Sequence, residues 1–242
     1  MNMLGLRFGP VLGYIPDLLQ GLELTALLAV GGVVLGGGLG LLLAIWRFMV
    51  PKHLKWLAFP VTAYVELIRN TPLLVQLYII FLGLPTIGIR LNPLEAGVLG
   101  LTLNLGAYAT EIFRAGFESI KKPQLEAGMS LGLSRLQVMR HVVLVPAVAK
   151  VWPSLMGQFI LMMLGTSICS FISVQEISGT AYTIQSETFL NLEVYIVIGV
   201  MYLAITMIMK ASLSRLGHTL FTGKVASGTR GATRPARQGV GR

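Results

Sequence analysis

Long apolar stretches alternate with short charged ones along the chain. Three of the apolar stretches, at residues 24–46, 151–175 and 194–209, contain no Asp, Glu, Lys or Arg. Two more, at about 56–83 and 96–113, contain isolated charges. An α-helix of about 20 residues crosses the hydrocarbon core of a membrane. The pattern therefore predicts an all-α membrane protein with five transmembrane helices, separated by loops at 84–95 and 176–193. The last predicted helix, with 16 uncharged residues, needs Phe189 and Leu190 or a thin membrane to cross.

The second apolar stretch is interrupted by a polar run from Glu66 to Pro72. Pro72 disfavours helical geometry at Thr71 and leaves carbonyls one turn earlier without their donor, so the helix should kink or break there. A charged side chain costs about 2.5 to 3.5 kcal/mol at the membrane centre, and Glu66 and Arg69 are spaced to pair on one helix. Exposed carbonyls and paired charges suit a substrate gate and a structural joint equally well.

Polar side chains also share a face of the third predicted helix. Asn104, Tyr108 and Glu111 follow the spacing i, i+4 and i+7, and this face would be costly to turn toward lipid. Substrate contact and hydrogen bonding to neighbouring helices explain each of these residues equally well. The fourth helix adds Gln158 and Ser167. The candidate pathway residues are Glu66, Arg69, Asn70, Thr71, Asn104, Tyr108, Gln158 and Ser167.

Glycines recur every fourth residue in the first predicted helix, at Gly32, Gly36 and Gly40. A face without side chains lets another helix approach closely, so the spacing favours helix packing. General glycine richness is the alternative, because further glycines dilute the pattern.

The stretch from Glu126 to Pro146 reads EAGMSLGLSRLQVMRHVVLVP and is too polar to lie in hydrocarbon. Its apolar positions are close to helical spacing, which predicts a short amphipathic helix over about 124–141. Gly128 and Gly132 leave a bare surface on which a partner could dock. An ordinary helix lying on the membrane surface is the alternative.

Composition and charge place this stretch on one side of a membrane. Of the 242 residues, 54% are hydrophobic and only 12% charged, about half the charged share of a soluble domain. Residues 47–55, 114–150 and 210–242 hold 16 of the 19 basic residues. By the positive-inside rule these segments and the C-terminus are cytoplasmic and the N-terminus is outside. This distribution explains the net charge of +9 without nucleic-acid binding. The single cysteine, Cys169, allows neither a disulfide within the chain nor a cysteine metal site.

Three segments resemble one family. The Glu126-Ala127-Gly128 run, Gly132 and the distal Pro146 resemble the cytoplasmic coupling motif of ABC-importer permeases, a helix-turn-helix that docks on an ATPase. The segments ELIRNTPLLVQ from Glu66 and AYATEIFRAG from Ala107 resemble permeases of the polar amino-acid uptake class. Two departures are visible, because Gly128 replaces an alanine and Pro146 stands one residue later than usual after Leu144.

The resemblance spans Leu19 to Leu216 and implies a permease in the bacterial inner membrane. Its partners would be a second permease subunit, identical or paralogous, two ABC ATPase subunits, and a periplasmic solute-binding protein. The substrate would be a small polar amino acid. ATP and Mg would bind to the ATPase, and no cofactor to this chain, which has no G-x-x-x-x-G-K-[ST] phosphate loop. The residues expected to couple to the ATPase are Glu126, Ala127, Gly128, Gly132 and Arg135.

Two other functions compete with this interpretation. A secondary transporter or channel subunit would also use broken helices and midplane charges. The sequence gives little support for a membrane enzyme, since His53, His141 and His218 do not have the spacing of metal ligands. No metal site is expected. The predicted organisation is a periplasmic segment at 1–18, a transmembrane permease domain at 19–222, and a disordered basic tail at 223–242.

Overall fold

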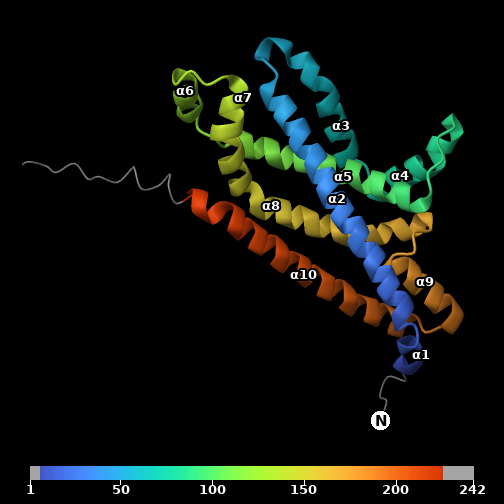
Figure 1. The fold of residues 1–242 in the computed structure, drawn as a ribbon. Coiled ribbons are helices and arrows are strands. Elements are labelled where there is room, and N and C mark those ends of the chain that lie inside the picture. Colours follow the sequence, from blue (N-terminus) through green and yellow to red (C-terminus); the bar gives the residue numbers. More distant parts are fainter. Residues whose placement is uncertain (1–5, 226–242) are drawn as a thin grey trace, which may run out of the picture.

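The computed structural model describes residues 6–225, which form helices and turns and contain no β-strand. The remaining terminal residues, including residues 226–242 of the predicted tail, lie outside the described range. Five helices make up most of the fold, with the others short (Figure 1). The five are α2 (Ile15–Met49), α5 (Pro93–Glu118), α8 (Leu144–Gly165), α9 (Ile177–Thr188) and α10 (Asn191–Val225).

Shorter helices connect these five. They are α1 (Phe8–Leu12), α3 (Phe59–Arg69), α4 (Leu73–Tyr78), α6 (Lys122–Ser130) and α7 (Arg135–Val138). Two π-helical turns occur at Ile79–Gly83 and Met139–Val143, and 3-10 turns at Lys52–Ala58, Leu84–Ile87 and Thr166–Ile172. The predicted loop at 84–95 contains the 3-10 turn at Leu84–Ile87 and the start of α5 at Pro93.

Three helical segments of the described chain are long and apolar enough to cross a membrane. They are Ile15–Met49, Arg135–Ile172 and Asn191–Phe221, and the bent pair Trp56–Arg69 and Leu73–Ile87 makes a fourth if it is taken as one span. Helix α5 contains the third predicted span but is not among them. Its glycines, with Asn104 and Glu111, make it less apolar than the others. The all-helical membrane fold is thus confirmed, with three or four apolar spans.

Three sequence predictions differ from the structure. Residues 176–193 are not a plain loop, because α9 occupies Ile177–Thr188 and Glu176 caps its first turn. The last span is not short, since α10 begins at Asn191 and ends at Val225. The single helix expected over 124–141 is broken into α6 and α7, in agreement with the helix-turn-helix that the family resemblance implies.

The core is built around the contact of α2 with α5. Gly32, Gly36 and Gly40 all lie on the buried face of α2. A Cβ atom placed on Gly36 would lie 2.9 Å from Leu105 Cβ, and one on Gly40 would lie 2.5 Å from Ala109 Cβ. The glycine spacing therefore serves helix packing, as predicted, with α5 as the partner of Gly36 and Gly40 and Met162 of α8 against Gly32.

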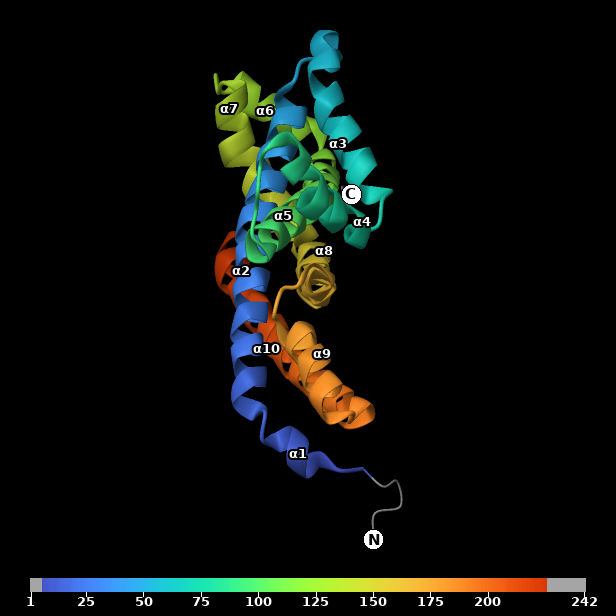
Figure 2. The same cartoon turned by 90° about the vertical axis from the view of Figure 1, so that its right-hand side faces the viewer.

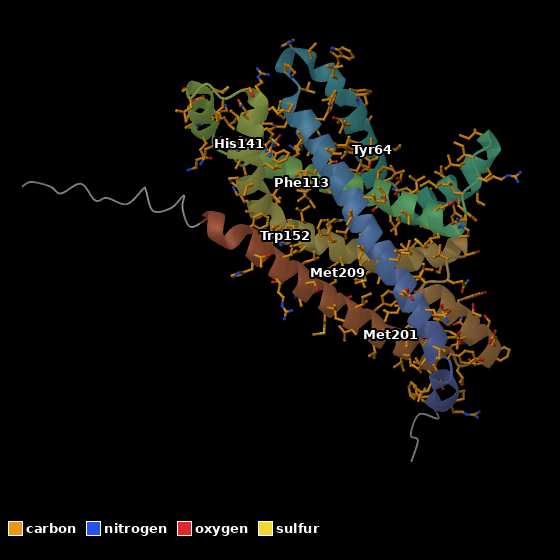
Figure 3. The ribbon with its side chains drawn as sticks, viewed as in Figure 1. Tyr64, Phe113, His141, Trp152, Met201 and Met209 are labelled. Carbon is orange, nitrogen blue, oxygen red and sulfur yellow. The ribbon has the colours of Figure 1, made fainter. Side chains whose placement is uncertain are left out.

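The remaining elements attach to this pair. Tyr64 on α3 donates from its hydroxyl to Leu103 O on α5 at 2.6 Å. Trp152 on α8 donates from Nε1 to Leu213 O on α10 at 3.2 Å, and Figure 3 shows its ring on the side of α8 nearest α10. Helices α6 and α7 lie at one end of the molecule and α1 at the other, in both views (Figures 1 and 2).

Candidate functional site

The polar run in the second apolar segment forms a sharp corner. Helix α3 ends at Arg69 and α4 begins at Leu73, and the chain bends by 111° between the two halves. Pro72 takes the extended conformation, with φ −66° and ψ 140°. The break that Pro72 predicted is therefore present.

Gln76 completes the hydrogen bonding at this corner. Pro72 has no N–H to donate to the carbonyl of Ile68, four residues earlier. Gln76 Nε2 donates to Ile68 O at 2.8 Å instead, and also to Thr71 O at 2.9 Å and Thr71 Oγ1 at 2.9 Å. The Gln76 side chain is buried at 7% exposure, so its amide replaces the missing backbone donor in an apolar setting.

The corner is joined to the polar face of α5 by two contacts. Asn104 Nδ2 donates to Gln76 Oε1 at 2.9 Å. The Arg69 guanidinium lies over the Tyr108 ring, with its carbon 5.5 Å from the ring centroid, within the range of a cation–π contact. The predicted residues Arg69, Thr71, Asn104 and Tyr108 therefore meet at one place.

The predicted ion pair between Glu66 and Arg69 is wrong. Arg69 turns to the Tyr108 ring, while the Glu66 carboxylate accepts from Asn70 Nδ2 at 3.1 Å. Asn70 Nδ2 also donates to Glu66 O at 2.8 Å, and both side chains are exposed. Opposite charges that are not neutralised by each other remain available to a charged ligand.

Ser167 and Gln158 stand apart from the corner in their hydrogen bonding. Ser167 Oγ donates to Leu164 O at 2.8 Å within its own turn. Its neighbour Gly165 lies against α4, since an added Cβ there would be 3.5 Å from Leu73 Cδ2. Gln158 is half-buried on α8. Their place in the pathway stays a prediction.

Glu111, the third member of the polar face, belongs to an ionic cluster instead. Its carboxylate accepts from Arg47 Nη1 on α2 at 2.6 Å and pairs with Arg114 Nη2 at 2.8 Å. Arg114 also pairs with Glu118, at 2.6 Å. This cluster ties the end of α2 to the end of α5 near the connection that leads into α6.

The predicted coupling stretch forms a hairpin of two short helices. Gly132 in the turn has φ +79°, a left-handed conformation that glycine adopts without a steric cost. Ser134 and Gln137 form a capping box at the start of α7, with Gln137 Oε1 accepting from Ser134 N at 2.8 Å. Leu131 at the tip is 81% exposed. Figure 3 shows His141 at this end of the molecule, where α7 continues toward α8.

The coupling residues divide between the inside and the outside of this hairpin. Glu126, Ala127, Gly132 and Arg135 are exposed. Gly128 is buried, because an added Cβ would lie 3.2 Å from Val138 Cγ2 and 3.4 Å from Val142 Cγ2. The bare surface expected at Gly128 therefore packs against the second half of the hairpin rather than facing a partner.

A buried carboxylate, Glu176, escaped the sequence prediction, which placed it in an acidic loop. It is 0% exposed and accepts from Tyr202 Oη at 2.6 Å, Gly179 N at 2.9 Å and Thr25 Oγ1 at 3.4 Å. Burial raises the pKa of the Glu176 carboxyl above its usual value, although the hydrogen bonds oppose the shift. This side chain ties α9 to α2 and α10.

An open groove of about 1220 Å³ lies between α9 and the first half of α2. Among its lining residues are three acids and no base, namely Asp17, Glu23 and Glu187. In the described part of the chain no three His, Cys, Asp or Glu side chains gather as metal ligands would.

Comparison with known proteins agrees with this architecture. Residues 25–220 match the family described as the binding-protein-dependent transport system inner membrane component. The probable glutamine ABC transporter permease protein GlnM of Bacillus subtilis (strain 168) is 38% identical over 168 residues, 69% of this chain and 76% of that protein. The glutamine transport system permease protein GlnP of Escherichia coli (strain K12) is 35% identical over 205 residues, 84% of this chain and 92% of that protein.

Solved structures show the same fold. A crystal structure of an amino acid ABC transporter with histidines matches with a TM-score of 0.78 at 34% identity, covering 89% of this chain and all of that one. The inward-facing MetNI methionine ABC transporter matches with a TM-score of 0.68 at 18% identity, over 88% of this chain and 98% of that one, which is a likeness of fold alone. Together with the exposed helix hairpin and the broken helix, these matches show that the chain is a multi-pass inner-membrane permease and belongs to the family of binding-protein-dependent transport system inner membrane components.

Proposed function

We propose that this chain is the permease subunit of an ATP-driven importer that carries a small polar amino acid. The observation that carries the proposal is the α6–α7 hairpin, which extends at the end of the molecule opposite α1 and has an exposed apolar tip at Leu131 (Figure 1). An ABC importer needs such a rigid element to receive movement from its ATPase. The family and the names of the similar permeases support the same function.

The partners follow from this role. Two ABC ATPase subunits would bind ATP and Mg and dock on the hairpins of two permease subunits, identical or paralogous. A periplasmic solute-binding protein would deliver the amino acid at the end that carries α1 and α9. Closure of the ATPases would move the hairpins and switch the pathway from inward-facing to outward-facing, a two-state change driven by differential ATP binding.

The corner between α3 and α4 supports an amino acid as the substrate. An amino acid carries an ammonium group and a carboxylate, and the corner offers the exposed carboxylate of Glu66 and the guanidinium of Arg69. Asn104 and Tyr108 add neutral polar contacts from α5. A site with one unpaired charge of each sign suits a zwitterion, because each charge of the ligand finds an opposite charge there.

We also infer five spans, with α3 and α4 forming one bent span and α5 another. The α6–α7 hairpin would then be cytoplasmic and α9 periplasmic. Labelling with a membrane-impermeant thiol reagent tests this topology, since the native Cys169 is fully buried. Ser186→Cys on α9 should react in intact spheroplasts and Ser130→Cys on α6 only after permeabilisation. The opposite order of labelling would contradict the proposed orientation.

Transport in reconstituted proteoliposomes tests the function itself. The permease with its ATPase and binding protein should take up an amino acid only when ATP is present on the ATPase side. Uptake driven by an ion gradient without the ATPase would instead show a secondary transporter or channel.

A single substitution tests the hairpin. Gly132→Asp should leave membrane insertion intact but reduce capture of the ATPase in a pull-down, because it places a charged side chain on the left-handed turn. Normal capture by this variant would count against the coupling role.

A further inference from the structure

We propose that Gln76 is a positioning residue, which orients the Asn104 amide so that its carbonyl oxygen accepts a hydrogen bond from an N–H group of the substrate. The proposal rests on the proposed function and deepens it, since it assigns a role to a buried glutamine at the corner. It also names the chemistry that Asn104 recognises, a substrate with an amino or amide N–H donor.

The first step is the direction of the Gln76 amide. Two of its partners, Ile68 O and Thr71 O, are backbone carbonyls, which can only accept hydrogen bonds. The third, Thr71 Oγ1, donates its own hydrogen to Leu67 O at 2.8 Å and so also accepts. The NH₂ end of Gln76 must therefore face the corner, and its Oε1 must face the other way.

The second step is the direction of the Asn104 amide on α5. Because Gln76 Oε1 can only accept, Asn104 must present its NH₂ end, and Nδ2 lies 2.9 Å away. Asn104 Oδ1 is thereby turned away from Gln76. Asn104 is only half-buried, and its oxygen is not among the buried polar atoms of the described chain that lack a partner. An accessible acceptor is thus fixed by a network that begins at Pro72.

The third step is the surroundings of this acceptor. Tyr108 follows Asn104 by four residues, a rise of about 6 Å along the helix, and carries the Arg69 guanidinium over its ring. The acceptor and this cation are thus attached to neighbouring turns of α5, and the pair suits an amino acid, which has an N–H donor and a carboxylate.

The test removes the two side chains singly and together. Gln76→Met removes the orienting amide, so Asn104 can turn its NH₂ end to the pathway. Asn104→Ala removes the acceptor itself. If Gln76 acts by orienting Asn104, the loss of the Asn104 amide makes Gln76 dispensable for the substrate affinity that remains.

The measurement uses the purified complex of permease and ATPase in nanodiscs, without binding protein. Its probe is the radiolabelled amino acid, among the common twenty, that the reconstituted wild-type importer takes up fastest with ATP. Gln76→Met should weaken binding about three- to tenfold, which corresponds to one neutral hydrogen bond. Gln76→Met combined with Asn104→Ala should bind within about twofold of Asn104→Ala alone, as expected when one residue acts through the other. Gln185→Met, at a half-buried glutamine on α9, is the matched control and should bind like the wild type.

Two results would overturn the proposal. Wild-type affinity in Gln76→Met would show that Asn104 needs no orientation. A double variant that binds clearly more weakly than Asn104→Ala alone would show that Gln76 acts by stabilising the corner and not through Asn104. Failure of the proposed function looks different, because the wild-type importer would then take up none of the twenty amino acids with ATP.

Discussion

Replacing Gly40 by alanine is expected to push α2 and α5 apart. The added Cβ would lie 2.5 Å from Ala109 Cβ, 2.9 Å from Gly106 O and 2.9 Å from Thr110 N. Carbon atoms in contact are about 3.5 to 4.0 Å apart, and two of these neighbours are backbone atoms of α5, which cannot rotate away. The helices must therefore separate by about 1 Å, and part of the packing between them is lost.

A second glycine of the same helix gives the matched comparison. Gly38 is exposed, and a Cβ atom there would have no neighbour within 4 Å. Alanine favours a helix over glycine by about 1 kcal/mol, and this gain is common to both variants. Overpacking a tight contact costs about 1 to 3 kcal/mol. The Gly40→Ala variant should be less stable than Gly38→Ala by that amount.

Unfolding of the purified permease in detergent measures the difference. Titration with a denaturing detergent, followed by circular dichroism, should show a lower midpoint for Gly40→Ala than for the wild type. Gly38→Ala should match or slightly exceed the wild type. Equal midpoints for the two alanine variants would refute the inference that α2 and α5 are in direct backbone contact at Gly40.

Other substitutions test the hairpin, the ionic cluster and the buried acid. Gly132→Ala should reduce ATPase capture in a pull-down more than Gly132→Asn, because a left-handed conformation costs about 1 to 2 kcal/mol and asparagine tolerates it better; equal capture would contradict this. Glu111→Gln should lower the free energy of unfolding by about 0.2 to 1 kcal/mol per lost ion pair, and high salt should shrink the loss; a salt-independent loss would argue against an ionic origin. Burial raises the pKa of the Glu176 carboxyl, so folding favours its protonated form. The stability that this carboxyl contributes is complete below its unfolded-state pKa of about 4.3. That stability is lost as the pH rises through the raised folded-state pKa. Melting temperatures from pH 4 to 8 should fall more steeply in the wild type than in Glu176→Gln, and identical slopes would exclude this titration.

Features that depend on neighbours in the chain were predictable from the sequence. The missing N–H of Pro72 acts within one turn, so the break could be located to the residue. The glycine spacing in α2 is likewise a local pattern, and its packing role followed from it. Charge counts in the apolar stretches sufficed for an all-helical membrane fold, because lipid penalises every charge in the same way.

Features that depend on distant partners were not predictable. Glu176 looks like an ordinary loop acid until α2 supplies Thr25 and α10 supplies Tyr202, 151 and 26 residues away. Arg69 pairs with the ring of Tyr108 instead of Glu66 because α5 lies close to the corner. Gln76 could have been suspected, since a polar residue one turn after a proline in an apolar segment must find acceptors. Its hydrogen bond with Asn104 could be seen only in the structure.

Pro146 lies at a widened turn where the coupling stretch meets α8. Pro146 cannot donate to the carbonyl of Val142, and its ring would clash with that carbonyl in a regular α-helix. The chain forms a π-helical turn over Met139–Val143, which widens the backbone just before the proline. Pro146 is exposed, while Val143 and Ala147 on either side of it are buried. The wide turn therefore accommodates the proline ring on the outer face, and the buried face continues from the hairpin into α8.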